Sequence, residues 1–118
     1  MIINDEMTEA YNARVQVDLN KLKKMTPSQL DRVKSYGSAA ENLLANKDFA
    51  LFVHHYKFDL MEQMSAINGY TSEADAHRIA AVHSMNGINS FIASLQKAAW
   101  YKNKVVVSQQ PQVEDPAQ

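Results

Sequence analysis

Apolar residues recur at steps of three and four along most of the chain, which is the period of an amphipathic α-helix. The pattern predicts four helices, over about residues 5–24, 27–45, 48–67 and 72–103. With only three glycines and three prolines, the chain has few points at which a helix must stop. We therefore predict an all-α fold, a small bundle of about four helices.

The second predicted helix has the clearest start. Thr26 is placed as an N-cap, Pro27 occupies the first helical position and Gln29 follows the cap by three residues, which is the spacing of a capping box. Gly37 is a weak point inside this helix. Asn46 either ends the helix or kinks it, so the second and third helices are either two elements or one bent rod.

The third and fourth predicted helices are separated by a short polar turn. Asn68-Gly69 is a pair that readily adopts positive φ and stops a helix. Thr71 or Ser72 then caps the fourth helix. This order predicts a long antiparallel hairpin of the third and fourth helices. We expect one helical domain over residues 1–104 and an extended or flexible tail over 105–118.

The third predicted helix carries apolar side chains on two opposite faces. One face of its helical wheel comprises Phe49, Phe52, Val53, Tyr56, Leu60, Met64 and Ile67. The other carries Leu51, Phe58 and Met61. Two stripes predict a helix that is covered on both sides, either at the centre of a bundle or with one side against another subunit.

The fourth predicted helix has one broad apolar stripe. Its members are Ile79, Ala80, Gly87, Ile88, Phe91, Leu95 and Ala98. Three of them, Ala80, Gly87 and Ala98, are small, so we expect a neighbouring helix to approach closely there.

Composition and charge exclude several classes of function. The 118 residues contain 12 basic and 13 acidic side chains, so no overall field directs the protein to nucleic acid or to an anionic membrane. The absence of cysteine removes disulfides and thiolate chemistry. Acidic residues near the start and the lack of a long apolar run predict neither a secretory signal nor a membrane span. We expect a cytosolic chain.

The residues that usually carry chemistry are not arranged for it. His54 and His55 are adjacent and point about 100° apart, and His77 and His83 are not at a helical ligand spacing. No phosphate loop, nucleophile motif or paired-carboxylate signature occurs. We therefore expect no enzymatic activity, no metal site and no cofactor.

Two basic clusters favour a nucleic-acid interpretation, although less strongly than a protein partner. The candidate phosphate contacts are Arg14, Lys21, Lys23, Lys24, Lys102 and Lys104. Trp100 and Tyr101 beside the second cluster could stack on bases. Basic residues near helix C-termini also complement the helix dipole, which explains several of them without a ligand.

The run ENLLANKDFALFVHHYKFDLMEQM, a polar turn and EADAHRIAAVHSMNGINSFIASLQKAA together resemble small helical-hairpin proteins of tailed bacteriophages. The resemblance covers residues 41–99. The positions that match are Leu43, Leu44, Asp48 and Phe49 at the opening, and Arg78, Ile88 and Leu95 on the return. It implies a phage-encoded, non-enzymatic protein, and it offers no catalytic residues to carry over.

These observations together predict a homo-oligomeric structural or assembly protein that binds a viral structural partner through apolar helix faces. The predicted interface residues are Leu51, Phe58, Met61, Trp100 and Tyr101, and Phe49, Phe52 and Tyr56 are further candidate contacts. We expect it in the host cytoplasm and in the virion. A regulatory or counter-defence protein that binds a host factor or nucleic acid is the alternative.

Overall fold

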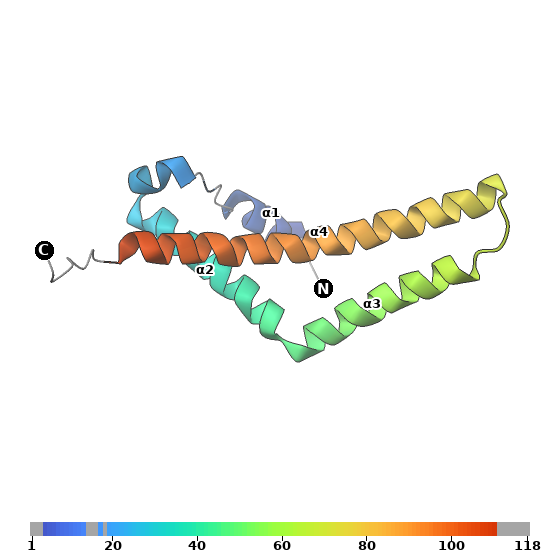
Figure 1. Ribbon diagram of the computed structural model, residues 1–118. Helices are drawn as coiled ribbons and strands as arrows, with labels where there is room; N and C mark the ends of the chain where they lie inside the picture. Colours follow the sequence, from blue (N-terminus) through green and yellow to red (C-terminus); the bar gives the residue numbers. More distant parts are fainter. Residues whose placement is uncertain (1–3, 14–16, 18, 111–118) are drawn as a thin grey trace, which may run out of the picture.

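The computed structural model describes residues 4–13, 17 and 19–110, and these form an all-α architecture (Figure 1). Its elements are α1 (Asn4–Ala13), a 3₁₀ helix η1 (Leu19–Lys24), α2 (Pro27–Ala45), α3 (Lys47–Ala66) and α4 (Ser72–Gln109). The prediction of an all-α bundle is confirmed. The two central helices begin and end within one or two residues of their predicted bounds.

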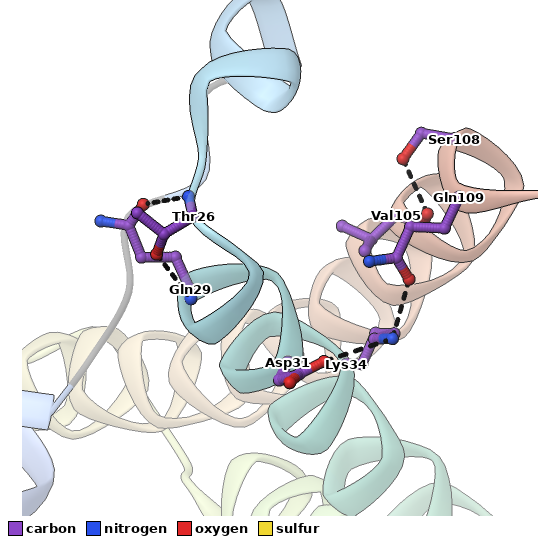
Figure 2. A network of polar contacts seen from close by, with 7 residues as sticks. All are labelled: Thr26, Gln29, Asp31, Lys34, Val105, Ser108 and Gln109. Atoms are coloured by element: carbon purple, nitrogen blue, oxygen red, sulfur yellow. Dashed lines mark hydrogen bonds and ion pairs between the residues drawn. The ribbon is translucent and has the colours of Figure 1, made fainter.

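Helix α2 begins at the predicted capping box. The Thr26 hydroxyl accepts a hydrogen bond from the Gln29 amide at 3.2 Å, and the Thr26 amide donates one to Gln29 Oε1 at 3.0 Å (Figure 2). The two bonds satisfy backbone and side-chain groups that the first turn would leave unpaired.

Asn46 separates α2 from α3, so these are two helices. Its backbone is extended, with φ −78° and ψ 121°. The Asn46 amide closes α2 by donating to the Leu43 carbonyl at 3.1 Å, and its Oδ1 opens α3 by accepting from the Phe49 amide at 2.9 Å. One residue therefore caps both helices, and the chain turns sharply there (Figure 1).

The turn between α3 and α4 forms as predicted. Gly69 has a φ of 83°, a conformation that costs glycine little, and Thr71 is the N-cap of α4. Arg78 then ties the turn to the new helix. Its guanidinium donates to Asp75 at 2.7 Å and to the Gly69 carbonyl, and it lies 5.3 Å from the centre of the Tyr70 ring.

The tightest packing joins α2 to α4, which cross at Gly37. A Cβ placed on Gly37 would lie 2.3 Å from Lys102 Cβ and 2.8 Å from the Ala98 carbonyl oxygen. The helices touch there because the glycine has no side chain. A buried cluster of Ala40, Leu95 and Ala98 lies alongside, with Leu44, Phe49 and Ile92 packed against it.

Three expectations about α4 packing need correction. The close approach is at Gly37 and Ala98, whereas a Cβ on Gly87 would meet nothing within 4 Å and Ala80 is exposed. The α3–α4 hairpin exists, but α4 packs more extensively on α2. Ile79, placed on the apolar stripe, is also exposed. The buried residues of α4 are Leu95 and Ala98 from that stripe, together with Ala81 and Val105, which were not placed on it.

The predicted bounds at the two ends of the chain are wrong. Residues 5–24 do not form one helix, since α1 ends at Ala13, residue 17 is not helical and η1 is a 3₁₀ turn. Val15, Val17, Asp18 and Asn20 are weak helix formers, which favours an interruption. The extended tail does not begin at residue 105, because α4 continues to Gln109 and Val105 is completely buried. The predicted tail from 111 to 118 lies outside the described residues.

The molecule is elongated. Its radius of gyration is 20.4 Å and its principal extents are 70 × 43 × 28 Å, whereas a compact domain of this length has a radius of gyration of about 13.5 Å. The accessible surface is 9636 Å², against roughly 6500 Å² for a compact protein of this mass. The chain therefore leaves unusually much of its surface exposed.

Candidate protein-protein interface on α3

Helix α3 presents a seam of side chains on the side that faces away from its buried stripe. Leu51, His54, Phe58, Met61 and Ser65 follow one another at alternating steps of three and four residues. A period of 3.5 is that of the contact positions in a coiled coil, where each side chain inserts between residues of a facing helix. We call these five residues the α3 seam.

The apolar members of the α3 seam have no cover within the described residues. The side chains of Leu51, Phe58 and Met61 are 49%, 59% and 52% exposed to solvent. A hollow at this site is open to solvent, and residues of α3 line it, including Phe58, Met61 and Ser65. The seam is therefore a ridged helix face suited to another helix and not a pocket for a small molecule.

The opposite face of α3 holds this helix in the fold. Leu60 is buried, and Val53 and Met64 are partly buried. The Phe49 ring packs edge-on against Phe91 of α4, with 6.2 Å between the ring centres. Phe49 is thus an internal contact that orients the seam outward.

Phe52 and Tyr56 correct the predicted two-face division of α3. Both were placed on the core-facing stripe, yet they are 72% and 44% exposed. They lie toward the flank of that stripe, and α3 and α4 do not pack closely enough to cover them. The exposed apolar surface of α3 is consequently wider than the second stripe alone.

Charged residues flank the α3 seam on its two sides. In the heptad that places Leu51 and Phe58 at position a, Lys57 occupies position g and Glu62 occupies position e. These are the positions at which opposite charges pair across a parallel coiled coil. Neither side chain has an ion-pair partner within the described residues.

Trp100 and Tyr101 do not belong to the α3 seam. They lie on α4, close to where α2 crosses it, and their rings meet edge-on with centres 5.2 Å apart. The five predicted interface residues therefore form two separate sites, three on α3 and two on α4.

The predicted basic residues that the structure describes gather at the end of the molecule where α2 begins and α4 ends. Lys34 Nζ donates to Gln109 Oε1 at 2.7 Å and links the two helices there (Figure 2). Lys102 is already paired with Glu41 at 3.0 Å. Lys21, Lys23 and Lys24 lie on η1, immediately before α2, and Arg14 lies outside the described residues.

The histidines form no common site. His54, His55, His77 and His83 are all exposed. Among the described residues, no three His, Cys, Asp or Glu side chains are grouped so that they could hold a metal ion. In the same part of the chain, no helix is long and apolar enough to cross a membrane.

Comparison of the chain with protein-family models, curated proteins and solved structures finds no match. The candidate interface therefore rests on the chemistry and geometry of this chain.

Proposed function

We propose that the protein is a non-enzymatic assembly component that associates with itself through the α3 seam. The observation that carries the proposal is the exposure of Leu51, Phe58 and Met61 at coiled-coil spacing on one helix. Fully burying a side chain of this kind contributes about 1.5–3 kcal/mol. Because these three side chains keep only about half of their surface exposed, association could recover at most roughly half of that free energy from each of them in every copy.

The surface area also favours a second copy over a small ligand. The accessible surface exceeds that of a compact protein of this mass by roughly half. Stable protein-protein interfaces bury about 1200–2000 Å² in total, and obligate homodimers bury more. An interface of this size would bring the surface per chain closer to the compact value.

The flanking charges favour a parallel arrangement of two α3 helices. In a parallel pair, Lys57 of one copy faces Glu62 of the other, and the two-fold symmetry forms this contact twice. His54 and Ser65 are the polar members of the seam. Polar groups at such positions fix register at some cost in stability.

The double substitution Leu51→Ser and Phe58→Ser tests the seam. We expect it to lower the mass measured by light scattering to that of one chain, because it removes two apolar contacts per copy, and to leave the helical circular dichroism signal in place. Tyr36→Ser with Val107→Ser is the matched control, since both residues are exposed helical apolar residues outside α3.

An unchanged mass for the Leu51 and Phe58 double variant would contradict the proposal. If that variant loses helical signal, the milder Met61→Gln change provides the test. It removes one exposed contact without altering the buried face, and we expect about a tenfold weaker association, the equivalent of about 1.4 kcal/mol.

We further propose that the assembly to which the protein belongs is a virus particle. The support is the resemblance of residues 41–99 to small helical-hairpin proteins of tailed bacteriophages, together with the candidate helix-binding face. We expect the protein to sediment with particles in a lysate of infected cells. Its recovery solely as a free pool bound to a host factor would contradict this and favour the regulatory alternative.

A further inference from the structure

The charges of the molecule are separated along its length. The end formed by residues 19–45 and 95–110 carries eight basic and two acidic side chains, a net charge of +6. Residues 46–94 carry three basic and five acidic side chains, a net charge of −2. The overall charge of −1 conceals this division. We call the first region the basic end.

Both acidic side chains of the basic end are already neutralised by contacts within it. Asp31 pairs with Lys34 at 3.4 Å, and Glu41 pairs with Lys102 at 3.0 Å. Six cations therefore have no carboxylate partner among the described residues. They are Lys21, Lys23, Lys24, Arg32, Lys97 and Lys104.

Two of these cations lie over an aromatic pair formed by the exposed Trp100 and the half-buried Tyr101. Lys97 Nζ lies 5.6 Å from the centre of the Tyr101 ring, and Lys104 Nζ lies 5.1 Å from that of Trp100. Trp100 is 45% exposed. Lys97, Trp100 and Lys104 follow one another at steps of three and four, so they share one face of α4.

We propose that the basic end binds single-stranded nucleic acid without sequence preference. The ammonium and guanidinium groups would contact phosphates, and the Trp100 ring would stack on an unpaired base. An acidic protein segment could use the charges, but it has no use for an exposed indole between two lysines. The α3 seam lies outside the basic end, so this inference does not depend on self-association.

The test is to titrate the protein into a fluorescently labelled oligothymidylate of about 20 nucleotides and to follow the anisotropy of the label. Quenching of the fluorescence of Trp100, the sole tryptophan, gives a second signal. We expect binding that weakens about 100-fold between about 50 and 200 mM salt if about five phosphates are contacted. At low salt, the double variant Lys97→Gln with Lys104→Gln should bind the oligonucleotide about tenfold more weakly than the unmodified chain, and its affinity should depend less on salt.

Lys47→Glu is the control, because it lowers the net charge by the same two units outside the basic end and outside the α3 seam. We expect it to bind like the unmodified chain. The inference is overturned if the unmodified chain does not bind the oligonucleotide at low salt, or if the Lys47→Glu control loses as much affinity as the Lys97 and Lys104 double variant. It is also overturned if a polyglutamate peptide binds as tightly, which would assign the basic end to an acidic protein.

Discussion

Gly37 sets the distance between the two helices that hold the fold together. Alanine is favoured over glycine inside a helix by about 1 kcal/mol. At Gly37, however, the added methyl would meet Lys102 Cβ and the Ala98 carbonyl oxygen at distances well below normal contact. Neither atom is the free end of a flexible side chain, so α2 would have to move away from α4.

We expect Gly37→Ala to lower the free energy of unfolding by about 1–2 kcal/mol, because overpacking outweighs the gain in helix propensity. Gly87→Ala is its matched control. Gly87 is also helical, but its added methyl meets nothing within 4 Å, so this change should raise stability by about 0.5–1 kcal/mol. Urea unfolding measures both. A stabilising Gly37→Ala would contradict the close crossing.

The sequence identifies residues that act locally better than residues that act across the fold. Thr26 was recognised as a cap because the amide that it caps lies within three residues of it. Asn46 was predicted only to end or kink the second helix, although the amide that it caps is equally close. Gly37 was predicted only as a weak point, since nothing in α2 shows that Lys102 and Ala98 lie against it. A glycine in the sequence does not show which distant residues pack against it.

At the scale of the helix, the last turns of α4 belong to the packed structure. Val105 has no exposed surface, and Gln109 accepts a hydrogen bond from Lys34 of α2. The valine run 105–107 was assigned to an extended or flexible tail because the sequence that follows it is polar and contains prolines. Three β-branched residues are also modestly unfavourable in a helix. Burial of Val105 outweighs that modest preference, which is the usual result when tertiary contacts oppose propensity.

A chain that ends at Lys104 should therefore be less stable than one that ends at Gln110. We expect a difference of about 2–3 kcal/mol in the free energy of unfolding, most of it from the buried Val105. The longer chain is the appropriate control because it retains all of α4. Equal unfolding midpoints in urea would contradict the packing of this segment.

The outward orientation of α3 could be predicted only in part. The sequence predicts that Leu51, Phe58 and Met61 share a face, because helix periodicity alone determines this. Phe52 and Tyr56 were placed on the core-facing stripe and also named as candidate contacts. Which of these applies depends on how closely α4 approaches α3, and the sequence does not show this. The 3.5-residue spacing of the α3 seam was present in the sequence, but His54 and Ser65 obscure it as an apolar pattern.

At the scale of the whole molecule, the elongated shape and the large accessible surface follow from the lengths of the helices. Helix α4 has 38 residues, about 57 Å at 1.5 Å per residue. Among the described helices, α2 packs most extensively on α4. The core of the molecule includes small residues such as Ala40, Ala81 and Ala98. So small a core explains why exposed apolar side chains would be stabilised by a partner.

The most direct test of self-association through the α3 seam is the mass of the full chain, measured by light scattering during size-exclusion chromatography. One chain has a mass of 13.3 kDa. We predict a mass of at least two chains that persists on dilution into the micromolar range. A peak at 13.3 kDa across that range would contradict self-association through α3.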